Sequence, residues 1–230
     1  MKSIFVIEDN NILRENYKEL LTEEGFSVHA FSNGKDALEQ IRRSLPDLVL
    51  LDITLGDERD AGFHICHELR KLSDMLPIVF FTEHENLSDK ISGMRLGADD
   101  YITKDIPLEY LIVRIKALLK RLEILTSAET SSKKRIARGH LTISPDELKV
   151  VWKGVPLDFT LTQFWMVWSL ARHPGQVKTH EQLKQAANIE VEMNTIAAHI
   201  KNIRRAFNRI DRSFSCIKTE RGAGYRWISN

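Results

Sequence analysis

Carboxylate, hydroxyl and amino side chains stand at the ends of four short apolar runs in the first half of the chain. They are Glu8, Asp9, Asp52, Thr82 and Lys104. A carboxylate buried alone is costly, whereas three acids held beside a lysine can bind a divalent cation and a phosphoryl group. A hard cation would also let a weak carboxylate nucleophile approach an anionic phosphoryl donor. These residue types therefore predict a site for a divalent metal and a transferable phosphoryl group.

The five side chains can meet only if the apolar runs are strands of one parallel sheet, because the carboxyl ends of such strands share one edge. The run before Asp52, at 48–51, is aliphatic throughout, which is typical of a strand buried on both faces. Strands are predicted at 3–7, 27–31, 48–51, 77–81 and 100–103, and helices at 11–24, 33–43, 63–72, 87–96 and 108–125. This alternation predicts an α/β fold with a doubly wound, five-stranded parallel sheet.

Charge divides the 230 residues into two unlike halves. Residues 1–121 contain 16 Lys and Arg against 22 Asp and Glu, a net charge of −6, and the remainder contains 17 against 10, a net charge of +7. An acidic module joined to a basic one favours a regulatory or catalytic domain tethered to a binder of polyanions. We therefore predict a first domain at 1–121, a small polar linker at 122–135 and a second domain at 136–230.

Neither a membrane span nor a disulfide is expected. The chain has no apolar run long enough to cross a membrane, and it begins without a signal-peptide pattern, which predicts a cytoplasmic protein. Cys66 and Cys216 lie far apart and lack the spacing of metal ligands. We expect both to be reduced structural cysteines.

The third helix predicted in the second domain, at 192–210, has one apolar face and one polar face. The apolar stripe consists of Ile196, Ile200, Ile203 and Phe207. The polar face mixes amide, small and cationic side chains: Asn194, Ala198, Lys201, Asn202, Arg204 and Arg205. Such a face suits the major groove of DNA, although on an isolated helix it is more often a solvated basic surface. A hairpin predicted at 216–228, with Arg221 at its glycine turn, favours the nucleic-acid interpretation.

The segment GADDYITK at 97–104, together with Glu8, Asp9, Asp52 and Thr82, resembles the receiver domain of two-component response regulators over residues 1–121. The resemblance implies that Asp52 accepts a phosphoryl group from a sensor histidine kinase, and that Thr82 and Lys104 contact its oxygens. The implied ligands of Mg²⁺ are Asp9, Asp52, the backbone carbonyl of Thr54 and, through water, Glu8. It also implies a switch in which Tyr101 is coupled to Thr82. A half-buried strand aromatic is the alternative interpretation of that tyrosine.

Three features depart from the usual receiver pattern. The loop 55–62 is longer and more charged, Glu83 replaces a small residue beside the phosphoryl path, and Asp105 replaces the proline that usually follows the lysine. A cis bond before a non-proline residue costs about 2.5–4 kcal/mol, so we expect the bond between Lys104 and Asp105 to be trans. These departures predict slow phosphorylation. They leave open a regulator of the same architecture that dimerises and binds DNA without phosphorylation.

Short strands are predicted at 141–143, 149–152 and 155–157, with helices beginning near Thr160 and Thr179. With the motifs LTQF at 161–164, HPG at 173–175, HIKNIRR at 199–205 and RGAGYR at 221–226, they resemble the winged helix-turn-helix domain of the OmpR/PhoB subfamily. The resemblance covers 136–228. It implies that the third helix reads bases, that Arg221 enters the minor groove and that RNA polymerase is a partner. Asn194 and Asn202 stand where arginine is frequent, and asparagine pairs well with adenine, so an A-containing half-site is expected.

The same resemblance implies a homodimer through the fourth helix, fifth strand and fifth helix of the receiver, which would place two winged helices on a direct repeat. Exposed charged pairs on that face are expected from Asp99, Asp100, Arg114 and Arg121. Lys90 would begin a third pair, but Tyr110 stands where its acid is expected, with Glu109 one residue away. Tyr110 could offset the lost pair by burying apolar area.

The sequence therefore predicts a DNA-binding transcription regulator switched by phosphorylation of Asp52. Its own chemistry would be limited to self-phosphorylation and slow hydrolysis. The rival from another class is a phosphohydrolase with an aspartyl nucleophile. Such enzymes tend to pair two aspartates, two residues apart, at the end of the first strand. Here Asp52 ends the third strand and is followed by Ile53 and Thr54, which counts against that rival.

Overall fold

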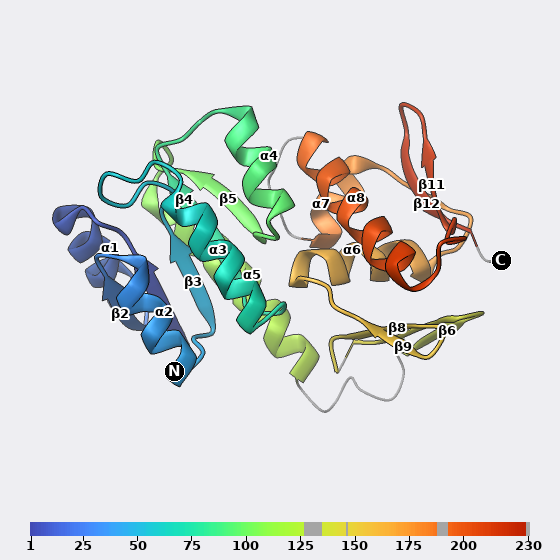
Figure 1. Ribbon diagram of the computed structural model, residues 1–230, viewed down its shortest axis with the longest axis horizontal. Coiled ribbons are helices and arrows are strands. Elements are labelled where there is room, and N and C mark those ends of the chain that lie inside the picture. Colours follow the sequence, from blue (N-terminus) through green and yellow to red (C-terminus); the bar gives the residue numbers. More distant parts are fainter. Residues whose placement is uncertain (127–134, 146, 188–192, 229–230) are drawn as a thin grey trace. The chain divides into compact units, whose positions relative to one another are not determined.

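The computed structural model describes residues 1–126, 135–145, 147–187 and 193–228 of the chain (Figure 1). The chain divides into two compact units, Met1–Leu119 and Lys120–Asn230. In the part of the chain that the structure describes, no helix is both long and apolar enough to cross a membrane. The segment 127–134, most of the expected linker, lies outside the described residues.

The first unit is built on a sheet of five parallel strands, as the alternation of apolar runs predicted. The strands are β1 Ser3–Ile7, β2 Ser27–Phe31, β3 Leu48–Leu51, β4 Ile78–Thr82 and β5 Asp100–Thr103. Their order is β2-β1-β3-β4-β5. Ile7 pairs with Leu51, and Leu51 with Phe80, so β1, β3 and β4 end at nearly the same level. This register brings the polar residues at those strand ends to one edge of the sheet.

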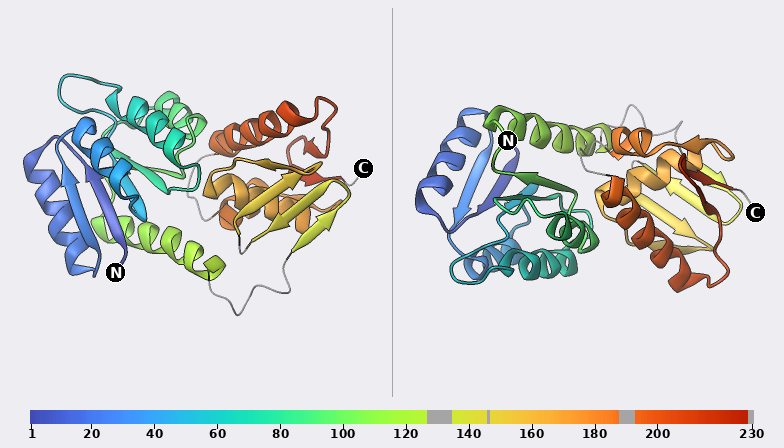
Figure 2. Two further views of the ribbon diagram at one scale, coloured as in Figure 1. Left: turned by 60° about the horizontal axis from the view of Figure 1, so that its bottom comes forward. Right: turned by 90° about the horizontal axis from the view of Figure 1, so that it is seen from above.

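Five helices cover the two faces of this sheet. They are α1 Asn11–Glu23, α2 Gly34–Arg43, α3 Ala61–Leu72, α4 Leu87–Arg95 and α5 Leu108–Thr126. The helices α2 and α3 lie on one face, and α1 and α5 lie on the other (Figure 2). Asn10 and Asn33 begin α1 and α2 by accepting hydrogen bonds from free backbone N–H groups of the first turn. The helix α5 runs to Thr126, past the domain boundary expected at residue 121.

After α5, the described residues of the second unit form two antiparallel sheets and three helices. One sheet consists of β6 Ile136–Arg138, β7 Leu141–Ser144, β8 Lys149–Trp152 and β9 Val155–Leu157. The helices are α6 Leu161–Arg172, α7 His180–Ala187 and α8 Met193–Ile210, and the other sheet has β10 Val177–Lys178, β11 Ile217–Glu220 and β12 Gly224–Trp227. The sequence predicted neither β6 nor β10. Each is too short to show a hydrophobic period, and β10 forms only because it pairs with β12.

Aromatic side chains join α8 to the terminal hairpin of β11 and β12. The Phe207 ring stacks on Phe214 at a centroid distance of 4.1 Å, and Trp227 of β12 lies 5.8 Å from Phe207. Gly224 has φ +143°, and a Cβ there would lie 2.1 Å from the backbone oxygen of Lys178. Only glycine therefore allows β12 to approach β10 this closely. The aromatic contacts fix the hairpin against α8, and the close approach at Gly224 joins β12 to β10.

Candidate functional site

The side chains at the carboxyl ends of β1, β3, β4 and the segment after β5 line one pocket of about 240 Å³. Its lining residues are Glu8, Asp9, Asn10, Leu13, Asp52, Thr54, Thr82, Glu83, His84 and Lys104. All five side chains singled out for phosphoryl chemistry lie here, with Thr54. The sheet therefore assembles residues that are up to 96 positions apart in the sequence.

Lys104 is the centre of charge in this pocket. Its Nζ donates to Oδ2 of Asp52 at 2.5 Å and to Oε2 of Glu8 at 2.7 Å. Burial would lower the pKa of Lys104, but the hydrogen bonds to Asp52 and Glu8 outweigh burial and raise it. Burial raises the pKa of Glu8, although Lys104 opposes that rise. The lysine is therefore held as a cation beside the carboxylate proposed to become the nucleophile.

Three carboxylates at this edge fit a hard divalent cation. Glu8, Asp9 and Asp52 each offer an oxygen, and these oxygens lie within 4.8 Å of one another. Carboxylates and water are the ligands that Mg²⁺ prefers, and Mg²⁺ usually keeps several of its waters. Asp9 is exposed and accepts a hydrogen bond of 2.9 Å from the backbone N–H of Gly56. The long loop 55–62 thus already contacts one of the carboxylates that would hold the cation.

Thr82, which lines the pocket, and Tyr101, which does not, are both buried. The Oγ1 of Thr82 accepts from the backbone N–H of His84 at 3.3 Å, and the hydroxyl of Tyr101 donates to the backbone oxygen of His84 at 2.8 Å. Burial raises the pKa of Tyr101, and the charges of Asp89 and Asp52 add to that rise. Tyr101 is a buried strand aromatic linked through one residue to Thr82. Its role as a switch stays a prediction.

His84 is the pocket residue that the sequence interpretation missed. Its Nε2 lies 2.9 Å from Oγ1 of Thr54, and its Nδ1 lies 2.9 Å from Oδ2 of Asp89. Its position was the only signal in the sequence. His84 stands two residues after Thr82, just past the end of a predicted strand, and the other candidate functional residues also follow strand ends.

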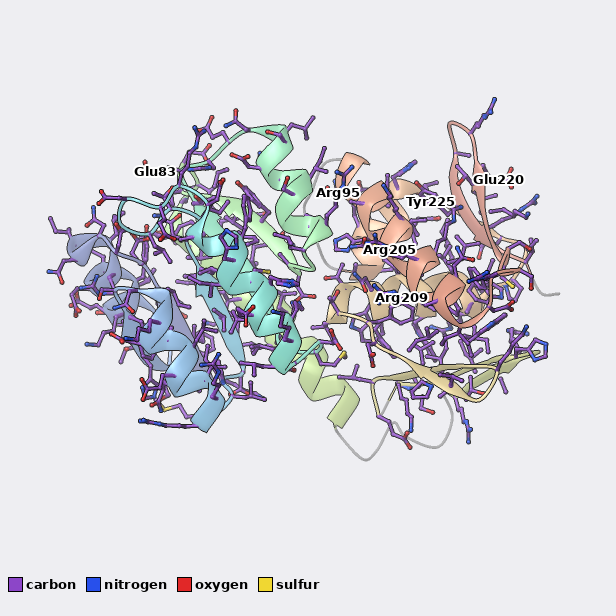
Figure 3. The ribbon with its side chains drawn as sticks, viewed as in Figure 1. Glu83, Arg95, Arg205, Arg209, Glu220 and Tyr225 are labelled. Carbon is purple, nitrogen blue, oxygen red and sulfur yellow. The ribbon has the colours of Figure 1, made fainter. Side chains whose placement is uncertain are left out.

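Two departures from the receiver pattern can be placed. Glu83 is exposed and lines the pocket, at the turn that follows β4 (Figure 3). The structure contains no cis peptide bond among its described residues, so the bond between Lys104 and Asp105 is trans, as expected. The backbone N–H of Lys104 instead donates to the oxygen of Thr82 at 2.9 Å.

Three of the charged residues expected to pair across a dimer, Asp99, Asp100 and Arg114, are buried and paired inside the chain, which corrects the prediction of exposed pairs at these positions. Asp99 is 0% exposed and accepts from Arg70 at 2.7 Å and from the backbone N–H of Ile78 at 3.1 Å. Asp100 is 1% exposed and accepts from Nε and Nη2 of Arg114 at 2.9 and 2.6 Å. Asp99 is thus covered by its contacts with α3 and β4, and Asp100, the first residue of β5, by Arg114 of α5, so neither acid stands on the surface.

The remaining residues expected at the dimer face are differently placed. Lys90 on α4 and Tyr110 on α5 are partly exposed, whereas Glu109 is exposed. The side chain of Arg121 lies outside the described residues, although its backbone continues α5. Of the residues expected at this face, Lys90, Glu109 and Tyr110 therefore reach solvent at least in part.

Helix α8 presents a narrower exposed face than its sequence suggested. Lys201 and Arg205 are exposed, and Asn202 is partly exposed. Ala198 is 5% exposed, which corrects its place on the polar face, and Ala197 stands there instead. Residues four apart share one helix face, so 197, 201 and 205 form the exposed row. The side chain of Asn194 lies outside the described residues.

Arg204 faces the hairpin rather than solvent. Its Nη2 donates to the backbone oxygen of Ile217 at 2.9 Å and to Oγ1 of Thr219 at 2.8 Å, and its guanidinium lies 5.7 Å from the centre of the Tyr225 ring. Figure 3 marks Tyr225 on the hairpin and Arg205 and Arg209 on α8. Arg221 is exposed in the turn between β11 and β12. The structure therefore leaves Lys201, Arg205 and Arg221 as exposed cations of this unit and gives Arg204 an internal contact.

Comparison with known proteins gives two family matches. Residues 4–116 match the family described as "Response regulator receiver domain", and residues 154–227 match "Transcriptional regulatory protein, C terminal". The transcriptional regulatory protein CreB of Escherichia coli (strain K12) is 29% identical over 227 residues, covering 97% of this chain and 96% of CreB. The alkaline phosphatase synthesis transcriptional regulatory protein PhoP of Bacillus subtilis (strain 168) is 32% identical, covering 98% of this chain and 96% of PhoP. The solved structure of DrrB, an OmpR/PhoB homologue of Thermotoga maritima, is 27% identical and covers all of both chains with a TM-score of 0.52.

Proposed function

The chain belongs to the OmpR/PhoB family of response regulators, and from this premise we propose that it regulates transcription when a partner histidine kinase phosphorylates Asp52. The observation that carries the proposal is the lysine at the carboxyl edge of the sheet, which contacts Asp52 and Glu8 together. It places a fixed cation beside a carboxylate nucleophile. A phosphohydrolase is disfavoured because the relatives that match nearly the whole chain are transcription regulators.

The chemistry asks one carboxylate oxygen to attack phosphorus. An oxygen of Asp52 forms the new bond to phosphorus while the bond from phosphorus to the donor histidine nitrogen breaks and leaves its electron pair on that nitrogen. Lys104 then balances charge on the phosphoryl oxygens, and the Thr82 hydroxyl donates to one of them. Bound Mg²⁺, held by Asp9, Asp52 and the Thr54 carbonyl with Glu8 through water, would neutralise the two anions as they approach.

Phosphoryl uptake at Asp52 tests the proposal. The full chain incubated with Mg²⁺ and acetyl phosphate should gain one phosphoryl group, and Asp52→Asn should gain none because an amide is not a nucleophile of this kind. Intact-protein mass spectrometry measures the gain. Asp57→Asn, in the exposed loop after β3, is the matched control and should be phosphorylated normally. Equal uptake by Asp52→Asn and the unchanged protein would refute the assignment.

A second route is favoured by one observation, the exposed carboxylate of Glu83 at the pocket. A like charge beside the entry of an anionic donor slows its approach. A regulator that dimerises and binds DNA without phosphorylation is therefore the second candidate. It predicts that Asp52→Asn binds its promoter as tightly as the unchanged protein.

We further propose that α8 enters the major groove and that Arg221 at the hairpin turn enters the adjacent minor groove. The exposed positions of Lys201, Arg205 and Arg221 support this. The proposal extends to a direct-repeat site, an A-containing half-site read by Asn194 and Asn202, contact with RNA polymerase, and a cytoplasmic location. The division into 1–121, 122–135 and 136–230 is kept as the proposed domain layout.

Lys201→Ala and Arg205→Ala are each expected to weaken binding to all DNA sequences. Each lost phosphate contact should also lower the slope of log affinity against log salt by about 1. Fluorescence anisotropy over a salt series measures both quantities. Lys71→Ala, an exposed lysine of α3, should change neither. Arg204→Ala should instead lower the melting temperature of the second unit, because its guanidinium contacts the hairpin.

We propose a homodimer through α4, β5 and α5, in which Tyr110 contributes buried aromatic area. Because Asp99 and Asp100 are paired inside the chain, apolar contact must carry more of this interface than charge does. Tyr110→Ala is expected to raise the dimer dissociation constant roughly tenfold, the usual scale for truncating an anchoring aromatic. Sedimentation equilibrium measures it. Leu72→Ala, an exposed apolar residue at the end of α3 and outside the proposed interface, is the control. An unchanged constant in Tyr110→Ala would exclude this face.

A further inference from the structure

His84 connects four separate parts of the first unit. Its ring joins Thr54, in the segment after β3, to Asp89, in the first turn of α4, with both nitrogen–oxygen distances at 2.9 Å. Its backbone N–H donates to Thr82 at the end of β4, and its backbone oxygen accepts from Tyr101 of β5. One residue therefore touches the segment beside the phosphoryl acceptor, the phosphoryl-contacting hydroxyl, the next helix and the buried tyrosine.

The ring can satisfy both side-chain partners at once. A neutral imidazole has one N–H donor and one acceptor nitrogen. With the N–H on Nδ1 donating to Asp89, Nε2 accepts the single proton of the Thr54 hydroxyl, because the other acceptor near that hydroxyl, the oxygen of Arg59, lies farther away at 3.4 Å. The carboxylate of Asp89 thus fixes the ring orientation, and the ring in turn orients Thr54.

The start of α4 lacks the side-chain cap that begins α1 and α2. Asn10 and Asn33 cap those helices with their side chains, whereas Asn86 at the start of α4, like Asp60 at the start of α3, makes no side-chain capping hydrogen bond. Asp89 in the first turn instead contacts His84, and Asn86 Nδ2 approaches the same carboxylate oxygen only at 3.5 Å. The first turn of α4 is therefore anchored through the His84 ring to the segment that follows Asp52.

We propose that His84 is a positioning residue that ties the segment after Asp52 to the start of α4 through its side-chain contacts with Thr54 and Asp89. This inference rests on the proposed function, because it describes a physical link between the proposed phosphoryl site and α4. All the atoms in the tie belong to the protein chain, so the tie does not require a phosphoryl group. It holds the Thr54 segment in place for metal binding and keeps the carbonyl of His84 where Tyr101 reaches it.

Hydrogen exchange of the full chain tests the tie. In His84→Ala, the backbone amides of 83–92 and of 54–60 should exchange roughly tenfold faster, the expected effect of losing hydrogen bonds that limit a local opening. His67→Ala, an exposed histidine of α3, is the matched control and should change neither segment. Unchanged exchange in both segments of His84→Ala would overturn the proposal. Equally faster exchange throughout the first unit would also overturn it, because that result means general destabilisation.

Two half-replacements separate positioning from simple packing. His84→Asn places an amide near the Nδ1 position, so it should protect 83–92 through Asp89 but not 54–60. His84→Gln places its amide near the Nε2 position, so it should protect 54–60 through Thr54 but not 83–92. Loss of protection in both segments in both variants would contradict a two-ended tie. None of these measurements uses a phosphoryl donor, so failed uptake at Asp52 would remove the proposed function and leave this result readable.

Discussion

Arg114→Ala is expected to lower the free energy of unfolding of the first unit by about 3–5 kcal/mol, the cost of leaving a buried charge without its partner. The carboxylate of Asp100 is 1% exposed and receives two hydrogen bonds from this one guanidinium. Urea unfolding followed by circular dichroism measures the loss. All four tryptophans lie in the second unit, so their fluorescence follows that unit separately in the same samples.

The double variant Arg114→Ala with Asp100→Ala is the control, because it removes both charges together. It should recover much of the lost stability. If it is as unstable as Arg114→Ala alone, the loss comes from packing rather than from the unpaired carboxylate.

The loss in Arg114→Ala should depend on pH. Burial raises the pKa of Asp100 above its ordinary value of 3.8 even with Arg114 beside it. The folded state then binds this proton more tightly than the unfolded state, so the contribution of Asp100 to stability falls as pH rises from 3.8 through the raised pKa. Removing Arg114 raises that pKa further. The destabilisation should therefore be smallest in acid and largest near neutral pH, and a loss independent of pH would contradict the ion-pair explanation.

Gly62→Ala should disturb the proposed phosphoryl site by displacing the backbone that carries Asp52. A Cβ at this position would lie 2.1 Å from the backbone oxygen of Asp52 and 2.6 Å from Cα of Ile53, so either the start of α3 or the segment carrying Asp52 has to move. Overpacking against backbone of this kind should cost about 3 kcal/mol of stability. A shift of about 1 Å at Asp52 should slow phosphoryl uptake from acetyl phosphate roughly hundredfold. DNA binding by the second unit should persist.

Gly56→Ala is the matched control in the same loop. Nothing lies within 4 Å of its added Cβ, and the cost is limited to its positive φ of +63°. About 1 kcal/mol is expected, with little change in the rate of uptake once the protein is folded. If the two variants lose uptake equally, backbone strain in the loop rather than the contact with Asp52 is responsible.

The sheet and its functional edge were predictable because they rest on strong local signals. Aliphatic strands of a parallel sheet end at one edge, so Asp52, Thr82 and Lys104 could be brought together from order alone. The partners of buried charges were not predictable. The sequence suggested that Asp99 and Asp100 are surface acids, whereas in the structure they bind Arg70 and Arg114. The short turns between a strand and the next helix were also not predictable, because they contain too few residues to show a hydrophobic period.

The exposed face of α8 was predictable only to within one residue, since Ala197 rather than Ala198 is exposed. The stripe from Ile196 to Phe207 was identified, but burial on α8 is wider than that stripe and includes Thr195, Ala198 and His199. Burial lowers the pKa of His199 to about 4, so a neutral ring fills the inner face of a helix whose sequence looks basic. This buried face is wide because α8 packs against several elements at once. The sequence of the helix alone does not show which elements those are. His84 was missed for the same reason, because its importance lies in partners from three other segments.

The contact of Arg204 with the hairpin has a consequence for the choice of DNA site. Because Arg204 and the Phe207 ring hold the hairpin against α8, the two elements proposed to read DNA form one stiff body with a fixed separation. A stiff reader cannot adjust its span, so the duplex must bend or change groove width to meet both elements. DNA sequences differ in the energy of such deformation. We therefore expect base pairs between the two contact points, touched by no side chain, to influence affinity through their flexibility.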